Sequence, residues 1–145
     1  MPELREKSEN VVYLTLGDPT IYCSFSYLLH ILEAEGYPVV LVSGVPSFCA
    51  AAARLNLLLT EWDELLHVIP SVHNTDEKLD QPGTYVLMKF AGHMKAVKEM
   101  LTNSSREAAA VLNCGMESEQ VCRSIEEIPD DAGYFSLIIS KQLPD

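Results

Sequence analysis

Basic residues are scarce in this sequence. Its 145 residues include 10 Lys and Arg against 21 Asp and Glu, which gives a formal net charge of −11. A field of that sign repels phosphate backbones, so the composition argues against a nucleic-acid-binding protein. The same field should also disfavour polyanionic small molecules as substrates.

Long apolar runs and metal-ligand patterns are absent as well. No apolar run approaches the roughly 18–20 residues of a membrane span, and the charged segment 1–7 has no signal-peptide core. The cysteines form no CxxC pair and the histidines no HxxxH pair, so neither a zinc site nor a redox motif is indicated. We therefore expect a cytoplasmic protein with free thiols, no membrane partner and no protein-bound metal.

Apolar residues, 48% of the chain, lie instead in short segments that suit an α/β fold. Apolar runs between turn residues predict strands over residues 11–16, 38–42, 65–70, 84–90, 108–112, 125–128 and 134–140. Helical spacing predicts helices over residues 24–35, 47–56 and 92–103, with a short helix or turn over 117–123. Ser24 and Ser47 are expected to cap the first two helices, and Gly36 to end the first. Residues 11–42 read as a right-handed βαβ unit.

Two turns follow the first two expected strands. Gly17-Asp18-Pro19 ends strand 11–16, and Ser43-Gly44-Val45-Pro46 ends strand 38–42. Open α/β sheets bind ligands at the carboxyl ends of their strands, and glycine lets a ligand approach the backbone closely. Each turn alone is more typical of an ordinary turn or helix cap. Two such turns at one sheet edge favour a shared pocket.

The chain resembles the tetrapyrrole (corrin/porphyrin) methylase family in the segments GDPTIY (17–22), GVPSFCAAAARL (44–55), LHVIPS (66–71) and TYVLMKF (84–90). Within that family it is most similar to the precorrin-2 and cobalt-precorrin-2 C20-methyltransferases of cobalamin (vitamin B12) biosynthesis. The resemblance implies a two-lobed α/β fold. Residues 1–46 would be the C-terminal part of a parallel-sheet first lobe (two strands and a helix), 47–58 a connecting helix, and 59–145 a complete mixed-sheet second lobe. The family's GxGPGD motif does not occur in this chain, so we expect a fragment of such an enzyme.

The resemblance also implies an activity, the transfer of a methyl group from S-adenosylmethionine (SAM) to C20 of precorrin-2 or its cobalt form by a homodimer. The SAM-binding positions that it implies are Gly17, Asp18, Pro19, Tyr22, Pro46, Ser47, Phe48, Met88, Lys89, Leu112, Asn113 and Ser136. Asp18 and Tyr22 are also the candidate catalytic residues. A carboxylate at Asp18 suits the region of the cationic sulfonium, and Tyr22 is placed to orient the macrocycle or take part in proton loss. No residue is assigned as a general base.

Two alternative functions stay open at this point. One is a non-catalytic SAM-binding or dimerisation module of the same fold, and the other is a methylase acting at another ring position. If strand 11–16 or 38–42 has an unpaired edge, the exposed apolar surface should drive oligomerisation. Because the implied substrate is a polycarboxylate, Arg54 and Lys89 are candidate cations for meeting it.

Several other residues have structural interpretations that we prefer. His67 is expected to be a strand residue with a solvent or polar neighbour, and Trp62 to pack within a lobe. Met94 and Met100 share a helix and should lie in its core. The pair Asp130-Asp131 is expected to be a solvated turn.

Overall fold

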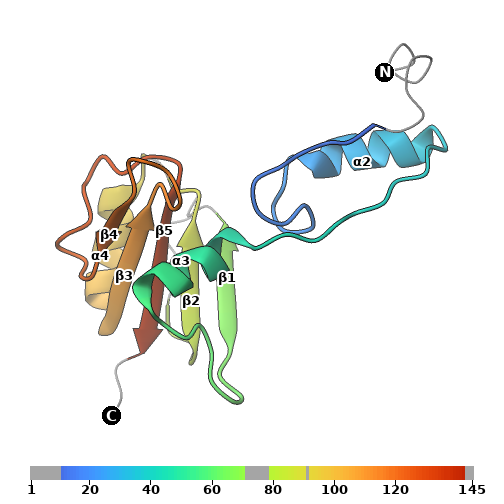
Figure 1. Cartoon of the computed structure of the whole chain (residues 1–145). Coiled ribbons are helices and arrows are strands. Elements are labelled where there is room, and N and C mark those ends of the chain that lie inside the picture. The colour runs from blue at the N-terminus through green and yellow to red at the C-terminus, as the bar shows by residue number, and fades with distance from the viewer. Residues whose placement is uncertain (1–10, 71–78, 91, 143–145) are drawn as a thin grey trace. The chain divides into compact units, whose positions relative to one another are not determined.

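The computed structural model describes residues 11–70, 79–90 and 92–142 (Figure 1). The chain forms two compact units, which divide between Val45 and Pro46. Among the described residues, no helix is long and apolar enough to cross a membrane.

The first unit holds one helix, α2 (Phe25–Ala34), which ends where the sequence predicts. Gly36 has a φ of +75°, a left-handed conformation that glycine adopts without strain. Its N–H donates to the carbonyl of Glu33 at 3.0 Å, and the next N–H donates to the carbonyl of Leu32 at 2.9 Å. Gly36 is therefore confirmed as the helix stop. Ser24 occupies the N-cap position, but its side chain makes no capping hydrogen bond.

The two strands predicted in the first unit are wrong. Residues 11–16 and 38–42 are irregular segments that join no β-ladder in the described part of the chain (Figure 1). Their apolar side chains are largely exposed, with Leu14 at 87% and Val40 at 85%. Valine and leucine suit a strand, but a strand also needs a neighbour that pairs its N–H and C=O groups. Because neither segment has such a neighbour here, the predicted βαβ unit does not form.

The second unit is a mixed sheet with strand order β1-β2-β5-β3-β4. Its strands are β1 (Leu66–Pro70), β2 (Thr84–Met88), β3 (Arg106–Leu112), β4 (Gln120–Cys122) and β5 (Ser136–Gln142). β1 and β2 are parallel, and β5 is antiparallel to both β2 and β3. Consequently β1, β2 and β3 run in one direction and end at one edge of the sheet. The predicted α/β mixed sheet is confirmed.

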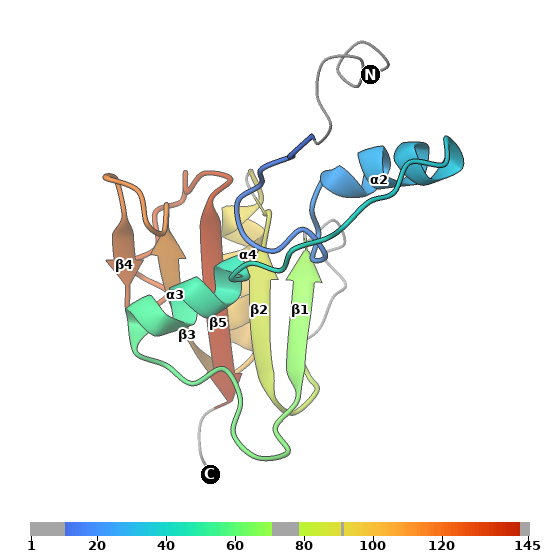
Figure 2. The same cartoon turned by 45° about the vertical axis from the view of Figure 1, so that its right-hand side comes forward.

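Helices α3 (Ser47–Leu55) and α4 (Met94–Asn103) cover opposite faces of this sheet (Figure 2). Alternation along each strand supplies apolar side chains to both faces. On the α4 face, the core contains Met94, Val97, Leu101, Tyr85, Leu87, Ala110 and Ile138. On the other face, α3 buries Phe48, Ala51, Ala52 and Leu55. The expected core role of Met94 is confirmed, and Met100 packs partly buried against the same cluster.

Two element predictions in the second unit are wrong. Residues 125–128 form a turn rather than a strand, although Ile128 is buried within the core. Residues 120–122, predicted as part of a helix or turn, form β4 instead. β4 pairs with β3 in the register Leu112↔Gln120 and Ala110↔Cys122, so residues 113–119 become a hairpin loop. Pairing with an existing strand overrides the weak local preference of such a short segment.

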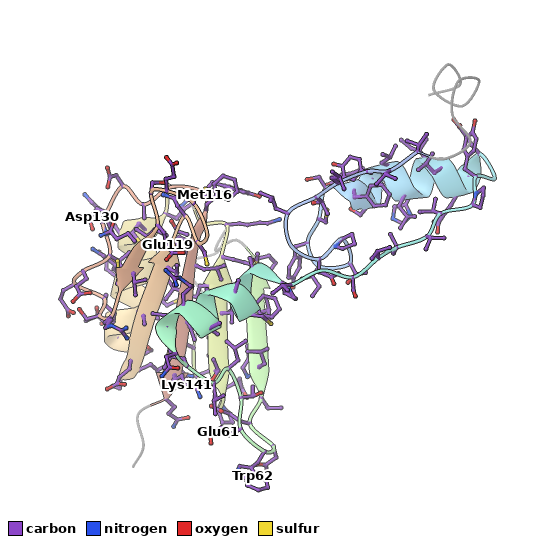
Figure 3. The ribbon with its side chains drawn as sticks, viewed as in Figure 1. Glu61, Trp62, Met116, Glu119, Asp130 and Lys141 are labelled. Atoms are coloured by element: carbon purple, nitrogen blue, oxygen red, sulfur yellow. The ribbon has the colours of Figure 1, made fainter. Side chains whose placement is uncertain are left out.

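The prediction for Trp62 is also wrong. Its side chain is fully exposed at the tip of the loop between α3 and β1, pointing away from the sheet (Figure 3). A φ of +51° at Trp62 marks a tight turn there. By contrast, the structural interpretation of His67 is confirmed. Its Nε2 donates to the carbonyl of Pro82 at 2.9 Å, and its ring stacks on Tyr85 with centroids 4.5 Å apart.

The guanidinium of Arg106 is buried beside the start of β2. Arg106 is 7% exposed and donates to the carbonyl oxygens of Gly83 and Gln81. It also lies 4.7 Å from the ring centroid of Tyr85. Burial lowers the pKa of Arg106, and the surrounding carbonyls and aromatic ring offset the loss of water.

Candidate cofactor site

The first candidate segment is the turn that contains Asp18. Its Oδ1 accepts hydrogen bonds from the N–H of Thr20, at 2.8 Å, and from the Thr20 hydroxyl. Its Oδ2 accepts the N–H of Gly44 at 3.0 Å, from 26 residues along the chain. The hydrogen bonds from Thr20 are the main cause that lowers the pKa of Asp18, so the carboxylate stays ionised at neutral pH.

Glycine is required where the two turns of the first unit meet. A Cβ on Gly44 would overlap the carbonyl oxygen of Gly17, and Gly17 itself has a φ of +82°. The structure therefore brings turn 17–19 and turn 43–45 together, but not at the predicted sheet edge, because the segments before them form no strands in the described part of the chain. Both oxygens of Asp18 are used to hold this junction, which makes Asp18 a brace between the turns.

Tyr22 lies on the same loop as Asp18. Its backbone is left-handed, with a φ of +49°, and its side chain is about half exposed. Pro19, which lies between Asp18 and Tyr22 in the sequence, is partly buried. The ring of Tyr22 therefore lies at the surface of the loop, on the same turn as Asp18.

The second candidate segment is the edge of the sheet where β1, β2 and β3 end. The register pairs Pro70 with Met88, Met88 with Leu137, and Leu112 with Ser136. Met88, Leu112 and Ser136 therefore lie at one edge, on three adjacent strands. Lys89 and Asn113 follow directly, with φ values of +59° and +50°. The structure thus gathers the five predicted residues of these strands.

Side chains at this edge are partly committed to the fold. Leu112 belongs to the core on the α4 face. The hydroxyl of Ser136 donates to the carbonyl of Gly133 at 2.7 Å. The N–H of Asn113 donates to the carbonyl of Phe135 at 2.8 Å, and its side-chain amide to that of Ser118 at 3.4 Å. What Leu112 and Ser136 offer a ligand is therefore mainly their backbone.

The third candidate segment is the start of α3. Pro46 is the N-cap, and its carbonyl accepts the N–H groups of Cys49 and Ala50 at 3.0 and 3.2 Å. Ser47 is an exposed first helical residue and makes no side-chain cap, so the predicted capping role of Ser47 is wrong. Phe48 is buried, as are Ala51, Ala52 and Leu55 of the same helix. The polar groups at this helix start are therefore backbone amides and the exposed hydroxyl of Ser47.

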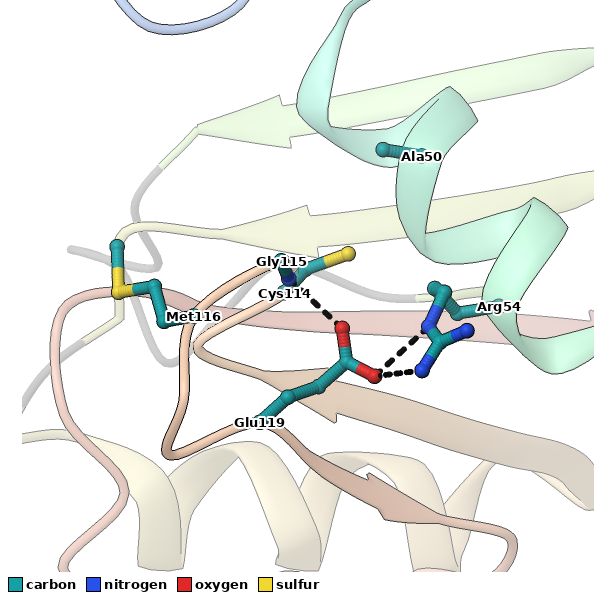
Figure 4. A pocket seen from close by; sticks show the side chains of 6 residues that line it. All are labelled: Ala50, Arg54, Cys114, Gly115, Met116 and Glu119. Carbon is teal, nitrogen blue, oxygen red and sulfur yellow. Dashed lines mark hydrogen bonds and ion pairs between the residues drawn. The ribbon is translucent and has the colours of Figure 1, made fainter.

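A pocket that sequence reasoning missed lies between α3 and the hairpin loop after β3. It has a volume of about 680 Å³ and is lined by Ala50, Arg54, Cys114, Gly115, Met116 and Glu119 (Figure 4). Glu119 binds the guanidinium of Arg54 and the N–H of Gly115. Arg54 and Glu119 are 65 residues apart, so no local pattern links them. Burial raises the pKa of the Cys114 thiol, which therefore stays protonated at neutral pH.

In the described part of the chain, no group of three or more His, Cys, Asp or Glu residues could hold a metal ion. The four cysteines are unpaired thiols. The expected solvated turn at Asp130 is exposed, and its carboxylate pairs with Lys98 at 2.7 Å.

The sequence profile of the family Tetrapyrrole (Corrin/Porphyrin) Methylases matches residues 1–129. The chain belongs to this family. A protein of Methanocaldococcus jannaschii named "Probable cobalt-precorrin-2 C(20)-methyltransferase" is 32% identical over 96% of this chain. The cobalt-precorrin-2 C(20)-methyltransferase of Salmonella typhimurium is 30% identical over 94% of it. The chain spans 61% of the length of each of these relatives.

Solved structures agree on the fold of this chain. A cobalamin-synthesis-related protein of Corynebacterium diphtheriae superposes with a TM-score of 0.78 at 16% identity, covering 99% of this chain and 67% of that one. The uroporphyrin-III C-methyltransferase of Thermus thermophilus, in complex with S-adenosylhomocysteine, gives a TM-score of 0.64 at 19% identity. That match covers 86% of this chain and 62% of the other.

Proposed function

We propose that this methylase transfers the methyl group of SAM to C20 of precorrin-2 or cobalt-precorrin-2 in cobalamin biosynthesis. The observation that carries the proposal is the likeness, 28–32% identical over most of the chain, to relatives named for that reaction. The chain spans 54–61% of the length of those relatives. The three candidate segments supply the glycine turns and strand ends at which α/β folds bind such ligands.

The chemistry of SAM needs little activation from the protein. A carbon nucleophile of the macrocycle displaces the neutral thioether S-adenosylhomocysteine (SAH) from the methyl group, and the proton lost from that carbon goes to solvent or a nearby base. The protein then contributes proximity and alignment of the two reactants. We assign Gly17, Pro46 and the backbone after Met88 and Leu112 to holding SAM.

Asp18 and Tyr22 take different parts in this proposal. Asp18 keeps a negative charge near the sulfonium and also braces the two turns, because both of its oxygens accept N–H groups of the loop. Tyr22 presents a half-exposed ring from the same loop, which suits orienting the flat macrocycle. Lys89 directly follows Met88 at the edge where the strands end, so we assign to it contact with the substrate carboxylates.

Two measurements on the purified chain test the proposal. Calorimetric titration with SAM and SAH measures cofactor binding, and incubation with SAM and each precorrin, followed by mass and NMR analysis, locates the added methyl group. Binding and methylation at C20 are expected. Binding with no transfer would favour the non-catalytic module, and a methyl group at another carbon would favour a different ring position. Light scattering on the same sample should show a homodimer or larger oligomer, and a monodisperse monomer would contradict that part.

A further inference from the structure

One carboxylate ties the hairpin loop after β3 to helix α3. Oε1 of Glu119 accepts Nε–H of Arg54 at 2.7 Å and also an Nη2–H of the same guanidinium. Oε2 of Glu119 accepts the N–H of Gly115 at 2.7 Å. We call this three-residue link the strap (Figure 4). It joins helix α3 to the hairpin loop across the pocket that both of them line.

The strap is built from interactions that hold their geometry. Only 13% of the Glu119 side chain is exposed, against 60% of that of Arg54, so the carboxylate is the sheltered partner. Two N–H groups of the planar Arg54 guanidinium converge on the same oxygen, Oε1, so two charge-assisted hydrogen bonds hold the pair. The ion pair lowers the pKa of Glu119, which keeps its carboxylate charged at neutral pH.

Each end of the strap lies on an element that carries predicted cofactor residues. Arg54 lies in the last turn of α3, whose first turn contains Ser47 and Phe48. Glu119 and Gly115 lie on the loop that begins at Asn113, directly after Leu112. A short helix moves as a rigid body, so fixing its last turn against the loop also fixes the spacing of these two segments.

We propose that Arg54 and Glu119 are positioning residues for SAM, because the strap sets the spacing between the start of α3 and the strand end at Leu112 and Asn113. The inference rests on the proposed function, since SAM is the ligand of that proposal. Neither residue is assigned a catalytic role. The strap acts on cofactor affinity through the backbone that it holds in place.

A purely stabilising ion pair is the competing explanation, and the chain offers a matched control for it. Lys98 and Asp130 form another pair at 2.7 Å in the same unit, from α4 on the opposite face of the sheet. That pair touches none of the predicted cofactor segments. Removing it should cost similar stability but leave SAM binding alone.

The test is calorimetric titration of SAH into the full chain and its variants, with the thermal unfolding midpoint measured for each. We expect Arg54→Met and Glu119→Gln each to weaken SAH binding about tenfold, the size expected for losing a charged hydrogen-bonded pair. Arg54→Lys should lose less SAH affinity, because the lysine ammonium can still donate one hydrogen bond to Glu119. Lys98→Met should bind within about twofold of the wild type while its midpoint falls as much as those of the strap variants.

The outcomes separate this inference from the proposed function. If the wild type binds SAH and both strap variants bind it equally well, the inference is overturned. If the wild type binds neither SAM nor SAH, the proposed function fails and the positioning of SAM fails with it. Amide exchange of Gly115 then tests only whether the strap orders the loop. Faster exchange of that amide in Glu119→Gln than in Lys98→Met supports loop positioning, and equal exchange overturns it. Should Arg54→Met not fold, Arg54→Lys replaces it in both measurements.

Discussion

The two units of the chain bury similarly apolar segments to very different extents. In the second unit every residue of β2 (Thr84–Met88) is buried, with Val86 and Leu87 fully enclosed. In the first unit, Leu14 and Val40 occupy similar runs and are 87% and 85% exposed. The difference lies in the neighbours, since β2 is flanked by β1 and β5 and the first-unit segments join no ladder. An apolar run becomes a buried strand only where other strands and a helix receive it.

The largest expected effect tests that contrast with one substitution in each unit. Leu87→Ala should lower the free energy of unfolding by about 2–5 kcal/mol, because it leaves a cavity in a packed core. Leu14→Ala should change it by no more than about 0.5 kcal/mol, since the side chain is already in water. Urea denaturation of both variants measures the two values. Equal losses would mean that Leu14 is buried in solution and that the contrast is wrong.

A smaller loss is expected from the buried cation of the second unit. Arg106→Met removes the donors to the carbonyl oxygens of Gly83 and Gln81 and should destabilise the protein by about 1–3 kcal/mol. Arg123→Met, at an exposed position, is the matched control and should be nearly neutral. The same denaturation measurement decides it. If the two variants have the same free energy of unfolding, the hydrogen bonds of Arg106 do not contribute to stability.

The junction of the first unit is expected to affect function more than stability. Gly44→Ala places a Cβ against the carbonyl of Gly17 and should separate the two turns that Asp18 braces. SAH binding should weaken about tenfold or more, a loss of about 1.4 kcal/mol. Gly133→Ala is the control, because a Cβ there meets nothing within 4 Å. If Gly44→Ala binds SAH as tightly as the wild type, these turns are not part of the cofactor site.

The smallest expected effect is a pH dependence of the strap. Glu119 faces Arg54, the Cys114 thiol and the N–H of Gly115, and hydrogen bonds from Arg54 hold its pKa below the ordinary value of 4.5. Stability from a lowered carboxyl pKa is complete above the unfolded value and is lost as the pH falls through the folded one. Wild type should therefore exceed Glu119→Gln in stability at neutral pH, and the two should converge in acid. A difference that stays constant on acidification would contradict the assignment.

Local sequence was sufficient for much of the second unit. The apolar segments around Val86 and Ile138 became central strands, and the spacing of Met94 and Val97 predicted α4. Local sequence failed where a partner decides the outcome. Residues 120–122 form a strand because their backbone pairs with β3. Residues 11–16 form none, because no neighbouring strand pairs with them in the described part of the chain.

The candidate site divides in the same way. Motif resemblance selected Asp18, Met88, Asn113 and Ser136, and the structure places the last three at one sheet edge. The resemblance did not reveal that both carboxylate oxygens of Asp18 accept backbone N–H groups, because one of the donors, Gly44, is 26 residues away. The sequence also did not reveal that Arg54, a candidate cation for the substrate, is paired with Glu119.

By itself, the sequence determined the family, the α/β class, the helix stop at Gly36 and the residue types available for binding a cofactor. These properties depend on local chemistry, which a run of neighbouring residues already contains. Only the tertiary structure decided which apolar runs are buried, which charges are neutralised and which loops are tied together. Those outcomes depend on contacts between residues far apart in the chain, such as Asp18 with Gly44 and Arg54 with Glu119. The net charge of −11 says nothing of such pairs, and so nothing of which cation is available to a polycarboxylate substrate.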